Sequence, residues 1–222
     1  MDRVSIIIPA FNEETRIKDT IAAVKNIADI FEIIVVDDGS KDKTAEIAGS
    51  AGAKVVRHSK NKGKGQALLN GVVNCTGDII VFLDGDTGAS AREVEKLIIP
   101  IKNHNYDMSI AKFKSSGKKG GFGIVKAVSR YGIKLICGQN VETVISGQRA
   151  FRADIIRDVK FNNGYGAEVG MTIDILKKGC SFCEIEVDMT HRETGRDIKG
   201  FVHRGRQLFH ITKALFAKRR EY

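Results

Sequence analysis

Residues 79–83 form an uninterrupted apolar run, Ile-Ile-Val-Phe-Leu, and two aspartates, Asp84 and Asp86, follow it one glycine apart. Five apolar residues in a row are typical of a strand that is buried on both faces, as in a parallel sheet covered by helices. Two carboxylates this close repel each other unless a positive group lies beside them. A metal ion with a phosphate next to it would meet that need, although this motif alone does not establish one.

The first half of the chain alternates between strand and helix patterns. The segments predicted as strands are 4–10, 31–39, 53–58 and 78–84, and those predicted as helices are 13–27, 41–52 and 63–75. Such alternation, with nearly continuous apolar strands, indicates an α/β fold with a mostly parallel sheet between helices. Ligands of such sheets bind beyond the carboxyl ends of the strands. Charged residues gather at or just after those ends: Asp37, Asp38, Lys64, Asp84 and Asp86.

The second half is less regular. Helices are expected at 91–102, 124–136 and 168–179, strands at 106–113 and 181–189, a glycine- and lysine-rich loop at 114–123, and a basic helix from Lys199 onward. Because no low-complexity linker interrupts the chain, we expect a single domain over 1–222, with parts 1–90, 91–198 and 199–222.

The charge of the chain restricts its partners. It carries 36 Lys and Arg against 27 Asp and Glu, a formal net charge of +9, which suits an anionic partner such as a nucleotide, a phosphorylated metabolite, a nucleic acid or an acidic membrane. No apolar run approaches the ~20 residues that span a bilayer. The N-terminus lacks the pattern of a signal peptide, so a cytoplasmic protein is expected.

Four motifs occur in a fixed order in the first ninety residues: "PAFNE" at 9–13, "DDGS" at 37–40, "NKGKGQAL" at 61–68 and "DGD" at 84–86. This set resembles the nucleotide-sugar glycosyltransferases of the GT-A fold, specifically family two. The resemblance implies a hexosyltransferase with a UDP-sugar donor, most simply UDP-glucose, and makes residues 1–90 the nucleotide-binding half. The donor-binding residues that it implies are Pro9, Ala10, Glu13, Asp37, Asp38, Lys64, Asp84, Gly85 and Asp86.

The same resemblance implies a divalent metal, Mg²⁺ or Mn²⁺, at Asp86 with help from Asp84. These ions prefer oxygen ligands and often complete their shell with a substrate phosphate. As a Lewis acid, such an ion offsets the charge that develops on the leaving diphosphate. Gly85 keeps the backbone between the two acids free of a side chain where the nucleotide approaches.

Two segments of the second half extend the resemblance. "NGYGAEVGMTIDILKKG" (163–179) and "EVDMTHRETGRD" (186–197) are similar to the glucosyl-3-phosphoglycerate synthases. This implies that Glu168 contacts the donor sugar and that His191 completes the metal site. Glu168 or Asp188 is also a candidate general base, because the sequence leaves open whether transfer retains or inverts configuration.

"SGQRAF" (146–151) is more similar to small family-two transferases, some of which glycosylate polyprenyl phosphates. The acceptor is therefore expected to be anionic and phosphorylated, either 3-phosphoglycerate-like or a polyprenyl phosphate. The acceptor-binding residues expected are Lys118, Lys119, Ser146, Gln148 and Arg149, since Arg and Lys bind phosphate and carboxylate groups.

The C-terminal segment 199–222 repeats basic residues every seven positions, at Lys199, Arg206, Lys213 and Arg220. Its apolar residues are predicted to share the opposite side: Phe201, Val202, Leu208, Phe209, Leu215 and Phe216. A basic amphipathic helix can lie on an anionic membrane, but packing on its own domain or on a second subunit of a homodimer is favoured.

Three alternatives belong to other classes of function. A sugar nucleotidyltransferase would carry a glycine-rich, arginine-containing loop where this chain has "PAFNEETR". A nucleic-acid-binding protein is disfavoured because aromatic residues make up only 7%, tryptophan is absent and no recognition motif occurs. A non-catalytic sensor of nucleotide-sugars would keep the binding motifs and turn nothing over.

Overall fold

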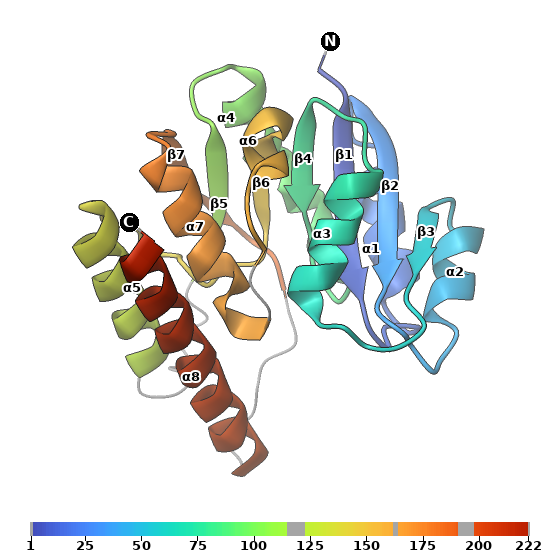
Figure 1. The fold of residues 1–222 in the computed structure, drawn as a ribbon. Coiled ribbons are helices and arrows are strands. Elements are labelled where there is room, and N and C mark those ends of the chain that lie inside the picture. The colour runs from blue at the N-terminus through green and yellow to red at the C-terminus, as the bar shows by residue number, and fades with distance from the viewer. Residues whose placement is uncertain (1, 115–122, 162–163, 191–197, 222) are drawn as a thin grey trace.

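The computed structural model describes residues 2–114, 123–161, 164–190 and 198–221. A single sheet of seven strands, in the order β3-β2-β1-β4-β6-β5-β7, runs through the described part (Figure 1). The strands are β1 (Val4–Ala10), β2 (Ile30–Asp37), β3 (Lys54–Arg57), β4 (Ile79–Phe82), β5 (Met108–Phe113), β6 (Arg149–Arg152) and β7 (Phe182–Val187). The helices are α1 (Ile17–Lys25), α2 (Thr44–Ser50), α3 (Lys64–Asn74), α4 (Glu95–Lys102), α5 (Ile124–Cys137), α6 (Ala153–Arg157), α7 (Ala167–Lys177) and α8 (Ile198–Glu221), with 3₁₀ turns η1 (Gly88–Val94) and η2 (Gly164–Gly166).

The predicted mostly parallel, helix-covered sheet is confirmed. β3, β2, β1 and β4 pair in parallel, and β7 pairs in parallel with β5. β6 pairs antiparallel with both β4 and β5. The sequence did not predict β6, because its residues, Arg-Ala-Phe-Arg, place a charge at each end of a very short apolar stretch.

Alternate residues of the strands enter two separate cores. In β1, Ile6 and Ile8 join the core under α1, α2, η1 and α4, whereas Ile7 joins the core under α3, α6 and α7. Phe82 of β4 also enters the second core, where its ring packs edge-on against the ring of Phe151 of β6, with 5.0 Å between the ring centroids. Burial on both faces explains why these strands are apolar throughout rather than alternating.

The strand order changes direction beside β1. From β1 the chain proceeds outward through β2 and β3, and then returns through α3 to β4 on the other side of β1. The segments that follow β1 and β4 lead onto the same face of the sheet, where η1 packs against α1, so the loops after these two strands lie side by side at their carboxyl ends. This is where the "PAFNE" and "DGD" motifs lie.

Two helix starts differ from the sequence-based prediction. α1 begins at Ile17, because residues 13–16 form a turn, and α2 begins at Thr44 rather than at 41. Ser40, four residues before α2, does not cap this helix, and its Oγ accepts a hydrogen bond from the Asn12 backbone N–H at 2.9 Å. Its hydroxyl thus ties the loop after β1 to the loop after β2.

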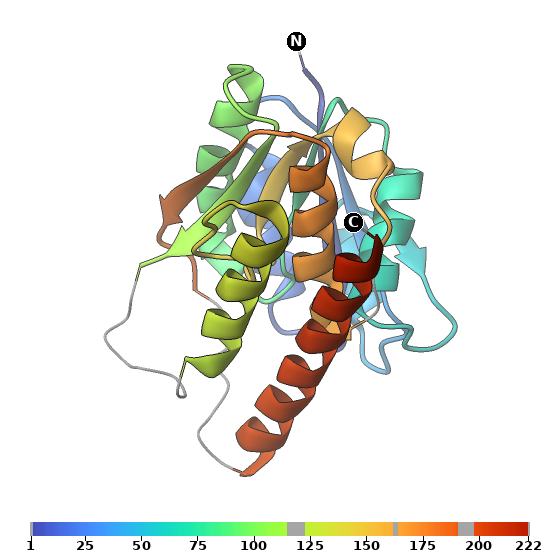
Figure 2. The ribbon, with the colours of Figure 1, turned by 60° about the vertical axis from the view of Figure 1, so that its left-hand side comes forward.

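The predicted C-terminal helix is present as α8, which lies beside α5 and extends past the edge of the sheet (Figure 2). The side that it buries differs from the prediction. Ile211, Ala214 and Lys218 are buried, whereas Phe209 and Phe216 are 66% and 67% exposed. In the described part of the chain, no helix combines the length and the apolar character that crossing a membrane requires.

Candidate active site

A cleft of about 340 Å³ opens at the carboxyl ends of β1, β2 and β4, and we call it the donor cleft. Eight of the nine expected donor residues line it, together with Phe11, Asn61, Gly63 and Ala67. The eight are Pro9, Ala10, Glu13, Asp38, Lys64, Asp84, Gly85 and Asp86. The strand-end convergence predicted from the sequence is therefore present.

Asp37 is the ninth expected donor residue, and it lies behind the cleft wall. Its side chain is fully buried, where Oδ1 accepts a hydrogen bond from the Ser40 N–H at 3.0 Å and Oδ2 lies 3.1 Å from Arg57 Nε. Asp38 lines the cleft and accepts hydrogen bonds from the backbone N–H groups of Lys62 and Gly63, each at 2.8 Å. The two neighbouring acids therefore have different roles. Asp37 holds the turn that follows β2, and Asp38 holds the loop that leads into Lys64.

The "DGD" loop is fastened to α1 through its backbone. The Gly85 carbonyl accepts a hydrogen bond from Thr20 Oγ1 at 2.9 Å, and the Asp86 carbonyl accepts one from Arg16 Nη1 at 3.0 Å. Because its carbonyls are held from behind, the loop can present its carboxylates to the cleft. Sequence reasoning missed both supporting residues, since a polar residue in or beside a helix gives no signal of a partner 65–70 residues away.

Lys64, the first residue of α3, lies between two carboxylates. Its Nζ is 2.7 Å from Asp84 Oδ1 and 3.3 Å from Glu168 Oε1. Burial alone would lower the pKa of Lys64, but the charges of Asp84 and Glu168 outweigh burial and raise it. The ammonium group therefore stays charged and is the positive group beside Asp84 in this structure.

Glu168 and Gln148 complete the surroundings of this ion pair. Glu168 lies in the first turn of α7, where the partial positive charge of a helix N-terminus favours a carboxylate. Gln148 donates from Nε2 to Asp84 Oδ2 at 2.8 Å. Residue 147 must be glycine for this arrangement, because a Cβ there would come within 2.4 Å of Lys64 Nζ.

A second cleft, of about 350 Å³, shares Lys64 and Asp84 with the donor cleft, and we call it the acceptor cleft. Ser146 and Gln148, two of the residues that the sequence predicts to bind the acceptor, line it. Three further basic residues that the sequence did not single out, Lys112, Lys126 and Arg130, also line it. The spacing of Lys126 and Arg130, four residues apart in the first half of the helix, was the available signal.

The Ser146 hydroxyl is buried in the wall of this cleft. The residue is 8% exposed, and its Oγ has no hydrogen-bond partner among the described residues. A buried polar atom without a partner costs free energy, and a hydrogen bond to a polar group in the cleft would remove that cost.

The position of Arg149 does not agree with the expectation that this residue contacts the acceptor. Its side chain is fully buried and donates to the backbone carbonyls of Ser146 and Val144 and to Thr172 Oγ1. Burial lowers the pKa of Arg149 to about 10, so it remains charged at neutral pH. In this structure Arg149 holds the 144–148 segment against α7 and does not reach the cleft.

Three expected site residues, His191, Lys118 and Lys119, lie outside the described residues. Within the described ranges, no three His, Cys, Asp or Glu side chains are grouped closely enough to hold a metal ion. Asp84 and Asp86 nevertheless both line the donor cleft and offer the carboxylate oxygens that Mg²⁺ and Mn²⁺ prefer.

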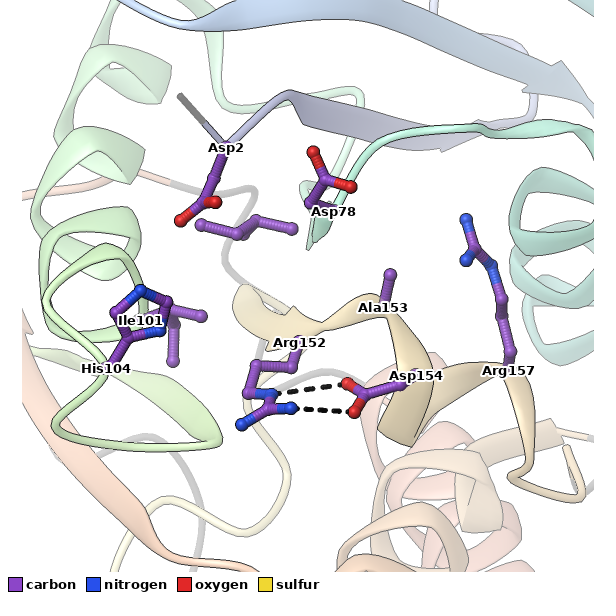
Figure 3. Close-up of a pocket in the computed structure, with 9 residues that line it drawn as sticks. Asp2, Asp78, Ile101, His104, Arg152, Ala153, Asp154 and Arg157 are labelled. Carbon is purple, nitrogen blue, oxygen red and sulfur yellow. Dashed lines mark hydrogen bonds and ion pairs between the residues drawn. The ribbon is translucent and has the colours of Figure 1, made fainter.

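A larger cavity, of about 510 Å³, lies at the opposite edge of the sheet, near the amino ends of β1 and β4 (Figure 3). Asp2, Asp78 and His104 line it, and an ion pair between Arg152 and Asp154, 2.8 Å apart, crosses its wall. Ligands of parallel sheets bind at the carboxyl ends, and this cavity carries none of the motif residues. We therefore assign the site to the two smaller clefts.

The family model of glycosyl transferase family 2 matches residues 5–160, so the chain belongs to this family and is a nucleotide-sugar-dependent glycosyltransferase. It is 33% identical over 205 residues to an uncharacterised protein of Methanocaldococcus jannaschii, covering 86% of this chain and 83% of that one. It is 29% identical to glucosyl-3-phosphoglycerate synthase of Petrotoga mobilis, and the match covers 99% of this chain and 74% of that one. It is also 29% identical to dolichol-phosphate mannosyltransferase of Pyrococcus furiosus, covering 85% of this chain and 56% of that one.

The fold is also that of a solved structure. Glucosyl-3-phosphoglycerate synthase of Mycobacterium tuberculosis, crystallised with Mn²⁺, uridine diphosphate and phosphoglyceric acid, superposes with a TM-score of 0.84 at 24% identity. The match covers 98% of this chain and 78% of that one. The GT-A fold expected from the motifs is thereby confirmed.

Proposed function

We propose that this glycosyltransferase moves a hexose, with glucose as the first candidate, from a UDP-sugar to an anionic, phosphorylated acceptor. The observation that carries the proposal is that the donor and acceptor clefts meet at Asp84 and Lys64. A donor in one cleft and an acceptor in the other would have their reacting atoms beside the same charged pair. Holding two reactants in such a geometry supplies a large part of an enzymatic rate enhancement.

A divalent cation, Mg²⁺ or Mn²⁺, fits the acidic end of the donor cleft. Asp86, with Asp84, would hold it, and His191 is proposed to complete its coordination. When bound, the ion would supply Lewis-acid stabilisation of the departing diphosphate. The solved relative from M. tuberculosis was crystallised with Mn²⁺ and uridine diphosphate, which supports this choice of ion and nucleotide.

The chain's own residues would then divide the work. Pro9, Ala10, Glu13 and Asp38 would bind the nucleoside, while Lys64 would bring a fixed positive charge to the phosphates. Glu168 lies across Lys64 from Asp84, with 12% of its side chain exposed, where it would bind the sugar or accept the proton of the acceptor hydroxyl.

The basic wall of the acceptor cleft supports a phosphorylated acceptor. Lys112, Lys126 and Arg130 would bind its phosphate, the Ser146 hydroxyl would donate to it, and Lys118 and Lys119 are proposed to add to the same charge. The names of two relatives point to acceptors that carry a phosphate, 3-phosphoglycerate and dolichol phosphate.

The decisive test is release of UDP from a panel of UDP-sugars with Mn²⁺ or Mg²⁺, with 3-phosphoglycerate, glycerate or a short polyprenyl phosphate added in turn. We expect one phosphorylated acceptor to stimulate release, and glycerate to fail because it lacks the phosphate. Calorimetry with UDP and Mn²⁺ should show metal-dependent binding that Asp86→Ala abolishes. Tight UDP binding without release from any donor would contradict the proposal and favour the nucleotide-sugar sensor.

A further inference from the structure

α5 and α8 pack tightly along one side of the molecule. Gly132 of α5 lies directly against Leu215 of α8, since a Cβ on Gly132 would come within 2.5 Å of the leucine side chain. Ile133 and Ile211 are fully buried beneath the pair. Figure 2 shows the two helices side by side, with α8 extending below the sheet.

The outer face of this helix pair is apolar. Half of the large apolar side chains that are exposed in the described part of the chain lie on α5 and α8: Ile124, Tyr131, Leu135, Phe209 and Phe216, each between 54% and 70% exposed. A groove of about 420 Å³ runs between the helices, and Tyr131, Leu135 and Phe216 line it. We call it the α5–α8 groove. An apolar patch of this kind on a protein surface marks an interaction site.

The charge of the chain is concentrated on the same two helices. Their sequences contain ten of the 36 Lys and Arg residues and one of the 27 Asp and Glu residues, so their formal net charge equals the +9 of the whole chain. The rest of the chain is balanced. Lys126, Arg130 and Lys134 of α5 are exposed, as are Arg206, Lys213, Arg219 and Arg220 of α8.

We propose that the α5–α8 groove docks onto the surface of an anionic lipid bilayer. The exposed aromatic and aliphatic side chains would enter the boundary between head groups and acyl chains, while the surrounding cations would contact lipid phosphates. The charge argues against a second copy of this chain as the occupant, because two copies of this strongly basic helix pair would repel each other.

Docking would also place the acceptor cleft beside the bilayer. Lys126 and Arg130, which line that cleft, belong to the same helix as Tyr131 and Leu135. The docking proposal nevertheless stands apart from the proposed function, because it requires neither nucleotide nor metal. Asp86→Ala should therefore bind vesicles as well as the unaltered protein does, even if it turns nothing over.

Co-sedimentation of the full chain with vesicles tests the proposal. We expect binding to an equal mixture of phosphatidylcholine and phosphatidylglycerol, little binding to phosphatidylcholine alone, and release at high salt. The double variant Leu135→Ser/Phe216→Ser should bind at least about tenfold more weakly. Its matched control, Val73→Ser/Ile99→Ser, removes two apolar side chains that are exposed on other helices, α3 and α4, and should bind normally.

Two results would overturn the proposal. One is the absence of binding to anionic vesicles at low salt, and the other is equal weakening in the control variant. Sedimentation velocity without lipid checks the remaining occupant: a dimer that Leu135→Ser/Phe216→Ser dissociates would make this face an interface between copies. Should the double variant fail to fold, Lys134→Glu/Lys213→Glu, both at exposed positions, must weaken binding instead.

Discussion

Asp84 shows how a single residue can belong to two clefts. One carboxylate oxygen faces Lys64 at 2.7 Å and the other accepts from Gln148 at 2.8 Å. The repulsion expected between Asp84 and Asp86 is thus offset within the protein, before any metal or phosphate is considered. A cation entering the donor cleft would compete with Lys64 for Asp84 and would find its second carboxylate on Asp86.

Glu168→Gln separates the two roles proposed for Glu168. If it accepts the proton of the acceptor, turnover should fall by ~10²–10⁴-fold while UDP affinity is kept, because glutamine preserves the shape and loses the base. If it binds the sugar, the affinity for UDP-glucose should fall instead. Steady-state kinetics together with calorimetry distinguish the two, and Glu95→Gln, also in the first turn of a helix, is the control that should change neither.

Arg149→Leu should act on stability rather than on acceptor binding. The substitution leaves the carbonyls of Val144 and Ser146 and the Thr172 hydroxyl without their buried donor, which should lower the free energy of unfolding by about 1–3 kcal/mol. Urea denaturation measures this loss. Arg152→Leu, on the same strand with its side chain 46% exposed, should cost less than about 1 kcal/mol. An unchanged stability of Arg149→Leu, with weakened acceptor binding, would restore the acceptor role.

At the scale of elements, the close contact between α3 and β1 positions Lys64. Gly71, in the interior of α3, lies against the sheet, and a Cβ there would come within 2.2 Å of Ile7 Cγ2. Ile7 is fully buried and cannot move aside. The helix that carries Lys64 at its first residue is therefore held at a distance from the sheet that only glycine permits.

Gly71→Ala should consequently destabilise the protein by about 1–3 kcal/mol, because overpacking a buried contact forces the helix outward. Gly49→Ala is the matched control in α2, where the nearest atom to a new Cβ is Val55 Cγ2 at 3.8 Å. It should be neutral or stabilising by up to about 1 kcal/mol, since alanine has the higher helix propensity. Thermal denaturation of both variants checks this, and equal effects would show that the α3 contact is not close.

At the scale of the whole molecule, a buried ion pair attaches α8 to the rest of the fold. Lys218 Nζ lies 2.5 Å from Asp174 Oδ1 of α7, and the two side chains are 3% and 6% exposed. Burial lowers the pKa of Lys218, but hydrogen bonds to Asp174 and Glu221 outweigh it and raise the pKa above its ordinary value of 10.5. α8 carries much of the positive charge of the chain, and Lys218, one of these charged residues, attaches the helix to α7.

Lys218→Met should lower the free energy of unfolding by about 3–5 kcal/mol, because it leaves the Asp174 carboxylate buried without its ammonium partner. The raised pKa sets the pH dependence: the contribution of Lys218 is fully present below pH 10.5 and is lost as the pH rises through the folded-state pKa. The stability difference between the unaltered protein and Lys218→Met should therefore shrink in alkaline solution. Lys213→Met, at an exposed position, should show no such difference at any pH.

The sequence by itself determined six of the seven described strands, all except β6, and the edge at which the donor cleft lies. Runs such as 79–83 are recognisable because a strand that is buried on both faces must be apolar at every residue. The polar residues at the ends of those strands are recognisable for a second reason. Parallel strands bring their carboxyl ends to one edge of the sheet, where ligands bind. Eight of the nine expected donor residues line the cleft on that account.

Only the tertiary structure decided which charges are buried and which apolar residues stay outside. The burial of Arg149 depends on carbonyl groups and a hydroxyl that come together when β6 inserts between β4 and β5. The exposure of Phe209 and Phe216 depends on which side of α8 meets α5 and α7. Local patterns record how apolar a residue is, whereas its partners come from segments far apart in the chain, and only packing brings those segments together.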